Sequence, residues 1–155
     1  MPKLWHLKLE GYAYFITTCL ENRRRLCGNP RLARIVMDAV LYGRASGWYL
    51  LLAFVVMPDH LHLVVVPRAK TVPAAMRELK TFTAKRVGQR LGSEGKIWQK
   101  GYRDFVLDRK ASILQKIRYI EANPVRAGLV ESAEDYEFSS AGRPELVDWE
   151  FYAVP

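Results

Sequence analysis

The first third of the chain changes its pattern of apolar and polar positions twice. Residues 12–20, YAYFITTCL, alternate aromatic and β-branched residues, a pattern typical of a strand. The next ten residues, ENRRRLCGNP, carry charges, Gly28 and Pro30 and predict a loop. From Arg31 to Arg44 the apolar residues recur at the spacing of an amphipathic helix, at Leu32, Ile35, Val36, Ala39 and Val40. The pattern therefore predicts a strand, a loop and a helix.

Two apolar runs follow, separated only by Pro58 and Asp59. Residues 48–57, WYLLLAFVVM, and residues 60–67, HLHLVVVP, predict two strands of an antiparallel hairpin. We assign Asp59 to the turn. A role as a partner or ligand of a metal is the alternative for this carboxylate.

The second half predicts a helix, a short strand and another helix. Thr71 is a suitable N-cap for a strongly basic helix over residues 72–91. A loop then leads to the short strand FVLD at residues 105–108. The segment ASILQKIRYIEAN, residues 111–123, predicts a helix that stops at Pro124.

This order of elements favours an α+β fold in one domain over residues 1–155. We expect an antiparallel sheet with the helices packed on one face, close to the ferredoxin-like, split βαβ plan. RNA-recognition (RRM) modules share this plan, so the fold alone does not decide the function.

The composition is that of a globular protein, with half of the residues hydrophobic. The longest apolar run is about half of what a membrane-spanning helix needs, and the first ten residues lack a signal-peptide apolar region. Cys19 and Cys27 lack a paired spacing, which favours reduced, structural thiols in the cytoplasm. The net charge of +8 attracts phosphate backbones, although membrane-surface and other basic proteins share such an excess.

His60 and His62 lie two apart on a predicted strand, so both imidazoles leave the same face of the sheet while Leu61 and Leu63 point into the core. This geometry permits a two-histidine metal site with open positions, suited to Mg²⁺, Mn²⁺ or Zn²⁺. Two structural histidines are the alternative, and the spacing alone leaves it open. His6 has no partner at a useful spacing, and we assign it no role.

The last helix carries a second candidate. Ile113, Ile117 and Ile120 form a tight apolar stripe, and Tyr119 lies well off it. Asn123, four residues further on, shares the face of Tyr119. An ordinary surface tyrosine and a helix C-cap before Pro124 are the alternatives for these two residues.

Three motifs resemble one known family. The segments FVVMPDHLHLVV, IWQKGYRDFVL and IRYIEANPVRAGLV are similar to those of the single-tyrosine HUH transposases, specifically the REP-associated tyrosine transposases. The resemblance runs from about Tyr12 to Ser140. The segment ENRRRLCGNP and the tail after Gly142 depart from it.

The resemblance implies an enzyme that nicks and transfers single-stranded, hairpin-flanked DNA through a 5′-phosphotyrosine. It implies Tyr119 as the nucleophile and His60, His62 and Asn123 as ligands of Mg²⁺ or Mn²⁺. It further implies an association with the nucleoid when DNA is bound, and it leaves a monomer and a homodimer both open.

Basic side chains supply candidates for phosphate contacts, and each can equally be a solvated surface charge. They are Lys80, Lys85, Arg86, Lys100, Arg103, Arg118 and Arg126. Trp98 and Tyr102 lie among lysines and could stack on unpaired bases, while an anchor in the core is the alternative for Trp98.

Two other functions remain open at this point. One is a non-catalytic nucleic-acid-binding protein derived from the same fold. The other is a metal-dependent hydrolase of small phosphoesters, which the basic charge and the position of Tyr119 disfavour.

Overall fold

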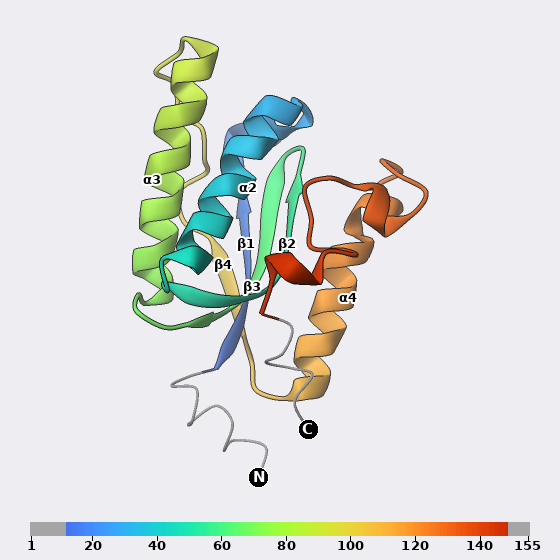
Figure 1. Cartoon of the computed structure of the whole chain (residues 1–155). Coiled ribbons are helices and arrows are strands. Elements are labelled where there is room, and N and C mark those ends of the chain that lie inside the picture. Colours follow the sequence, from blue (N-terminus) through green and yellow to red (C-terminus); the bar gives the residue numbers. More distant parts are fainter. Residues whose placement is uncertain (1–11, 149–155) are drawn as a thin grey trace.

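A four-stranded antiparallel sheet forms the centre of the computed structural model, which describes residues 12–148 (Figure 1). The strands are β1 (Ala13–Cys19), β2 (Tyr49–Met57), β3 (His60–Pro67) and β4 (Arg103–Leu107), in the order β2-β3-β1-β4. Because β3 lies between β1 and β2 and is antiparallel to both, β1 and β2 run parallel. The connection between them is α2 (Pro30–Ala45), so the predicted split βαβ plan is confirmed.

Local capping explains where the helices begin. The Asn29 side chain accepts a hydrogen bond from the Arg31 amide at 2.9 Å, and Pro30 occupies the first turn of α2. Thr71 Oγ1 accepts from the Ala74 amide at 3.2 Å, which confirms the predicted N-cap of α3 (Val72–Leu91). Gly92 ends α3 with a φ of 64°, a left-handed conformation that glycine adopts without strain.

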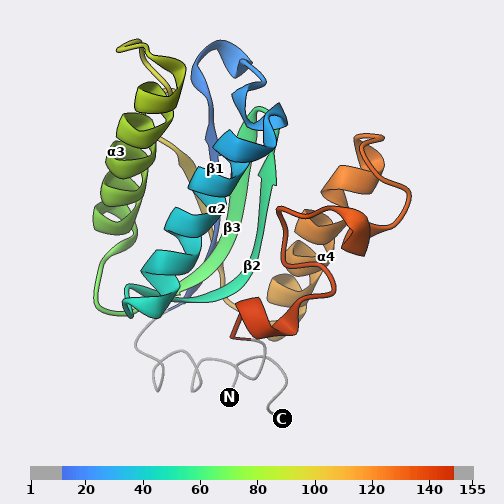
Figure 2. The ribbon, with the colours of Figure 1, turned by 45° about the horizontal axis from the view of Figure 1, so that its top comes forward.

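The helices cover both faces of the sheet, so the expectation that they pack on one face is wrong. Leu61, Leu63 and Val65 point toward α2 and α3. Val64 and Val66, on the opposite face of β3, pack with the third helix, α4 (Lys110–Arg126). Figure 2 shows α2 and α3 on one side of the sheet and α4 on the other. The reason is that β2 and β3 carry apolar side chains on both faces, and each face has to be shielded from water.

The predicted end of the last helix before Pro124 is also wrong. Pro124 lies inside α4, which continues to Arg126, so Asn123, for which a C-cap was the alternative role, is an internal helix residue. Proline removes one backbone hydrogen bond from a helix interior. Pro124 is buried, however, and follows Ile120 by four residues, so it extends the buried stripe of Ile113, Ile117 and Ile120 along α4. Apolar burial therefore compensates for the lost hydrogen bond.

The segment after α4 covers the outer edge of β2. The Val56 amide donates to the Phe138 carbonyl at 2.8 Å, and the Ser140 amide donates to the Phe54 carbonyl at 3.0 Å. Further along, the Asp148 amide donates to the Leu51 carbonyl at 2.7 Å. The segment after α4 thus shields a strand edge, and Asp148 is its one contact here from the tail after Gly142 that departs from the resemblance.

The described residues include both cysteines and all the helices named above. Both thiols are free; Cys19 is half-buried and Cys27 is buried, which raises the pKa of Cys27 to about 12. Between residues 12 and 148, no helix combines the length and the hydropathy that crossing a membrane requires. His6 and the first ten residues lie outside the described range.

Candidate active site

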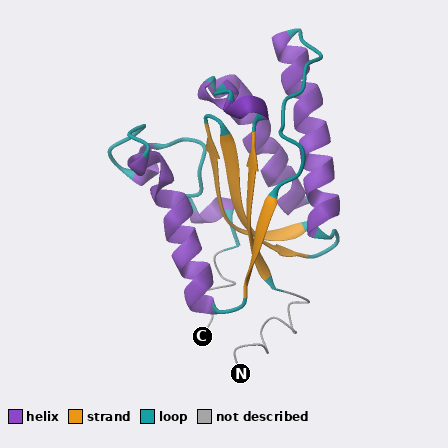
Figure 3. Cartoon of the chain, turned by 180° about the vertical axis from the view of Figure 1, so that it is seen from behind, coloured by secondary structure: helices purple, strands orange, loops and turns teal. Residues whose placement is uncertain are grey.

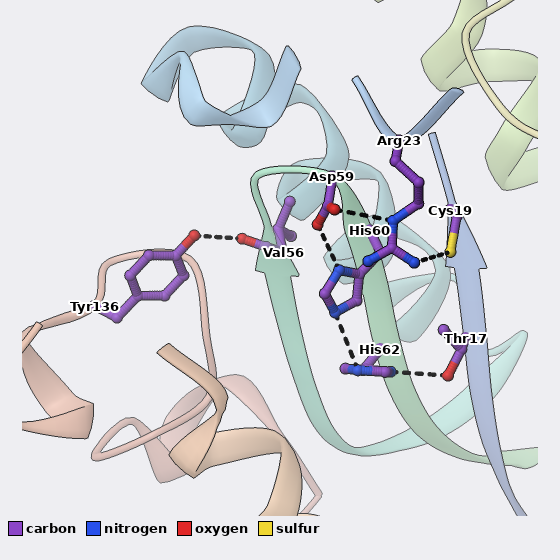
Figure 4. A network of polar contacts seen from close by, with 8 residues as sticks. All are labelled: Thr17, Cys19, Arg23, Val56, Asp59, His60, His62 and Tyr136. Atoms are coloured by element: carbon purple, nitrogen blue, oxygen red, sulfur yellow. Dashed lines mark hydrogen bonds and ion pairs between the residues drawn. The ribbon is translucent and has the colours of Figure 1, made fainter. Parts of the chain in front are cut away.

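The two histidines of β3 come together on the face of the sheet that α4 covers. His60 pairs across the strands with Cys19, and His62 pairs with Thr17. Their Nε2 atoms lie 3.1 Å apart, so both rings direct the same nitrogen toward one point (Figure 4). The prediction that both imidazoles share a face is confirmed. Leu61 and Leu63 are buried in the core on the other face, as expected.

Each ring is held by its other nitrogen. His60 Nδ1 donates to Asp59 Oδ1 at 2.7 Å, and Arg23 Nε donates to Asp59 Oδ2 at 2.9 Å (Figure 4). Burial would raise the pKa of Asp59, but these hydrogen bonds and the charges of His60 and Arg23 lower it overall. Asp59 therefore forms the predicted turn and also accepts from His60, so its carboxylate fixes the orientation of the ring.

His62 is the more buried ring, with only 6% of its surface exposed. Its Nδ1 lies 2.9 Å from Thr17 Oγ1, a group that can donate or accept as its hydroxyl rotates. Burial and the positive charges around it lower the pKa of His62 to about 3, so the ring is neutral at physiological pH. If Nδ1 donates to Thr17, Nε2 presents a lone pair beside that of His60. Two such lone pairs supply part of the donor set that a divalent cation requires.

Arg23 lies in a strained stretch of backbone beside the histidines. Asn22 and Arg23 have φ values of 57° and 54°, a left-handed region that non-glycine residues rarely adopt. Besides its contact with Asp59, Arg23 donates from Nη1 to Cys19 Sγ at 3.4 Å. Strain of this kind persists only where surrounding contacts fix it.

Tyr119 lies against His62 within the same chain. The ring centroids are 5.9 Å apart, and the Tyr119 ring also meets Phe15 edge-on at 6.0 Å. The cations of Arg126 and Lys116 lie 4.3 and 5.3 Å from the centroid of the Tyr119 ring. Tyr119 nevertheless remains 43% exposed, so a substrate can approach it from solvent.

Asn123 follows Tyr119 by one helical turn and is half-buried. Among residues 12–148, no group of three or more His, Cys, Asp or Glu side chains could hold a metal. A metal on the histidine pair would therefore need another kind of donor, such as an amide oxygen. The ligand role of Asn123 stays a prediction.

A cleft of about 620 Å³ opens beside the histidine pair, with Tyr119 and His62 in its wall. Aromatic, basic and small polar side chains from β1, the loop after β1, the loop before β4 and β4 itself complete its lining. Those residues are Phe15, Thr17, Thr18, Cys19, Arg23, Gln99, Lys100, Gly101, Tyr102, Arg103 and Phe105. A larger hollow of about 820 Å³ between α2 and α3 contains neither histidine nor Tyr119, so we place the reactive site in the smaller cleft.

Of the seven candidate phosphate ligands, three lie at this cleft. Lys100 and Arg103 line it, and Arg126 lies over the ring of Tyr119. Arg118 is exposed on α4. Lys85 lines the hollow between α2 and α3, and the Arg86 guanidinium lies 5.7 Å from the centroid of the Phe82 ring. All seven remain predictions as DNA contacts.

Lys80 and Trp98 hold the long connection between α3 and β4, which runs beside the sheet (Figure 3). Lys80 Nζ donates to the carbonyls of Gln99 and Gly101 at 2.8 and 2.5 Å. Burial lowers the pKa of Lys80. Trp98 is buried and donates from Nε1 to Thr83 Oγ1 at 2.9 Å, so it is a core anchor rather than a stacking surface.

Sequence reasoning missed Phe105, Arg23 and Thr17 in the lining of the cleft. It also missed Lys116, which lies over the ring of Tyr119. Arg23 belongs to a loop that resembled nothing known, and Thr17 becomes relevant only through its register with His62. One signal was available for Phe105. It is the first residue of the predicted strand FVLD, and a large apolar side chain on a strand is a candidate for the core or for a binding surface.

Comparison with known proteins defines the class of this chain. The family model described as transposase, IS200-like, matches residues 8–123, which is more than half of the chain. The chain therefore belongs to the IS200-like transposase family, and the fold and the paired histidines agree with that assignment.

Individual relatives show which kind of transposase this chain is similar to. The REP-associated tyrosine transposase of Escherichia coli K12 is 24% identical over 148 residues, which cover 91% of this chain and 86% of that protein. A solved REP-associated tyrosine transposase bound to a REP hairpin is 25% identical, with a TM-score of 0.70 over 87% of this chain and 79% of that one. A putative transposase from Deinococcus radiodurans R1 is 22% identical, with a TM-score of 0.48 over 69% of this chain and 88% of that one. The chain is thus similar to REP-associated tyrosine transposases, as its motifs indicated.

Proposed function

We propose that this transposase nicks and rejoins single-stranded DNA beside a hairpin, with Tyr119 as the nucleophile and a divalent metal as cofactor. The observation that carries the proposal is the contact between the rings of Tyr119 and His62 in one chain, at a centroid distance of 5.9 Å. The hairpin substrate is proposed by similarity to the relative whose structure holds a REP hairpin.

The chain's own residues suit a metal. His60 is oriented by the Asp59 carboxylate, and His62 is buried and neutral, so both Nε2 atoms can donate lone pairs to one ion. Asn123 would add a neutral oxygen ligand. Mg²⁺ or Mn²⁺ held by such neutral donors would polarise a phosphate oxygen as a Lewis acid.

The reaction exchanges one phosphodiester for another. The Tyr119 oxygen forms a bond to phosphorus, and the bond from phosphorus to the 3′ oxygen breaks. The phenol loses its proton to solvent, and the leaving 3′ oxygen takes one up. The products are a 5′-phosphotyrosine and a free 3′-hydroxyl, and rejoining requires no ATP.

Two cations support this step from α4. Arg126 and Lys116 lie over the ring of Tyr119 and favour the negative charge that develops on its oxygen. Arg126 also donates from Nη2 to the Tyr119 carbonyl at 3.1 Å, which ties it to the turn that carries the nucleophile. Lys100 and Arg103 line the cleft and would contact phosphates along it.

The test uses hairpin oligonucleotides taken from the flanks of the gene, with Mn²⁺ or with a chelator. We expect a covalent protein–DNA adduct, seen on a denaturing gel, only with Mn²⁺. Tyr119→Phe should abolish the adduct while binding of the oligonucleotide persists.

Tyr42→Phe is the matched control, because Tyr42 is an exposed tyrosine of α2 in the other hollow. It should leave the adduct intact. An adduct that persists in Tyr119→Phe would reject Tyr119 as the nucleophile. Release of a phosphate product without any adduct would favour a water-driven hydrolase instead.

A further inference from the structure

Phe105 is a large aromatic side chain exposed on the free edge of the sheet. It belongs to β4, the strand at one end of the sheet, and 58% of its surface is accessible to solvent. It pairs across the strands with Phe15, so its ring lies on the face that carries the histidines and Tyr119. Folding leaves this ring at the rim of the reactive cleft rather than in the core.

Phe105 ends a row of stacked rings that leads to the site. Its ring stacks on Phe15 at a centroid distance of 6.3 Å and an interplanar angle of 21°. Phe15 in turn stacks on His62 at 5.2 Å and 27°. Phe15 and His62 are both buried, so Phe105 alone offers an open ring face at the end of the row.

Positive charges surround the row. Lys116 Nζ lies 4.7 Å from the centroid of the Phe15 ring, and Arg103 precedes Phe105 by two residues on the same face of β4. Arg103 and Lys100 both line the cleft. An exposed ring among cations suits an unpaired base with its phosphates better than it suits a protein surface, which offers no regular negative charge.

We propose that Phe105 is the stacking platform for one unpaired base next to the phosphodiester that Tyr119 attacks. This inference rests on the proposed function for its substrate, single-stranded DNA. The platform would fix the register of the strand in the cleft, and it would favour any base with an accessible ring face over an abasic position.

The test measures binding and stacking in the presence of a chelator, so it needs no cleavage. The hairpin oligonucleotide carries 2-aminopurine at each single-stranded position in turn, and its fluorescence reports stacking. We expect wild-type protein to quench one position strongly. Phe105→Leu should abolish that quenching and weaken binding roughly 5- to 150-fold, the range for one base–aromatic stack. Phe105→Trp should retain both effects.

Val106→Ala is the matched control. Val106 is 56% exposed and adjacent in sequence, but its side chain leaves the opposite face of β4. It should leave binding and quenching unchanged, and thermal unfolding should show that all variants fold.

The proposal is overturned if Phe105→Leu binds and quenches like wild type, or if Val106→Ala loses as much. It is equally overturned if wild type self-associates in size-exclusion chromatography and both substitutions break that association, because β4 would then be an edge for a second copy. The binding and quenching measurements do not depend on the covalent adduct, so the outcome of Tyr119→Phe does not affect them. A wild-type protein that fails to bind the oligonucleotide would instead reject the proposed function itself.

Discussion

The Nε2 atoms of His60 and His62 lie 3.1 Å apart, while the other nitrogen of each ring is held by a different neighbour. Asp59 accepts from one ring, and the Thr17 hydroxyl contacts the other. When the pair binds no cation, one Nε2 has to carry a proton for this distance to be favourable. Rotation of the Thr17 hydroxyl allows His62 to carry that proton on Nδ1 instead. The two rings can therefore hydrogen-bond to each other without a metal, or present both Nε2 lone pairs to one.

The first prediction concerns the carboxylate behind His60. Asp59→Asn removes the charge that orients the ring, and we expect the affinity for Mn²⁺ to fall about 10- to 100-fold, as is usual for the partner of a metal-binding histidine. Isothermal titration with Mn²⁺ measures this affinity. Asp104→Asn, at an exposed carboxylate on β4, is the control and should bind Mn²⁺ as wild type does. Equal affinity in the two variants would restrict Asp59 to its role in the turn.

The second prediction concerns Glu121, which lies on α4 between Tyr119 and Asn123. It is half-buried and accepts from Ser140 Oγ at 2.9 Å. Burial raises the pKa of this carboxyl, and the hydrogen bond from Ser140 offsets part of that effect. The folded state therefore holds the proton more tightly than the unfolded state does. Stability falls as the pH rises from the ordinary pKa of the carboxyl, 4.5, through its raised pKa in the folded protein.

Glu121→Gln keeps an acceptor for Ser140 but cannot ionise. We expect it to raise the melting temperature at pH 7, with a difference that shrinks as the pH approaches 4. Glu131→Gln, at an exposed position after α4, should leave the melting temperature unchanged both at pH 7 and near pH 4. Calorimetry at a series of pH values measures the effect, and a variant that is less stable than wild type at pH 7 would contradict it.

The third prediction concerns the close approach of α2 to β2 at Gly43. Tyr49 is buried, and its hydroxyl donates to the Val40 carbonyl at 2.6 Å. A Cβ atom at Gly43 would overlap the Tyr49 hydroxyl and lie 2.9 Å from the Trp48 ring. Helix propensity alone favours alanine by up to about 1 kcal/mol, but overpacking of this kind costs about 1–3 kcal/mol.

We therefore expect Gly43→Ala to lower the free energy of unfolding by about 1–2 kcal/mol in urea denaturation. In a Tyr49→Phe background the cost should be smaller, because one of the overlapping atoms is gone. A stabilised Gly43→Ala variant would show that the side chains of Trp48 and Tyr49 move aside without strain.

The elements predicted best are those set by local interactions. Thr71 and Gly92 cap α3 through contacts within a few residues, and its predicted range of 72–91 is confirmed. The predicted end of α4 was wrong, because the burial of Pro124 depends on tertiary packing that the local sequence does not show. The helix on the second face was missed although a signal existed. The runs of β2 and β3 are almost continuously apolar, a pattern that indicates cover on both sides.

In the candidate site, too, the features set by local periodicity were predicted and those set by tertiary structure were not. His60 and His62 share a face by strand periodicity, and Tyr119 was separated from the apolar stripe by helix periodicity. Their meeting depends on α4 crossing the sheet, which periodicity does not describe and the resemblance implied. Arg23 and Phe105 join the cleft through a loop conformation and a strand register, and neither can be derived from spacing along the chain.

The two sides of α4 have a consequence for the evolution of such chains. Ile113, Ile117 and Ile120 anchor the helix in the core, whereas Tyr119 is half-exposed and is not among the core residues. If Tyr119 acts as proposed, a single substitution there would abolish the reaction without loosening the helix. Descendants that have become purely regulatory DNA-binding proteins should retain the isoleucine stripe while their tyrosine position drifts.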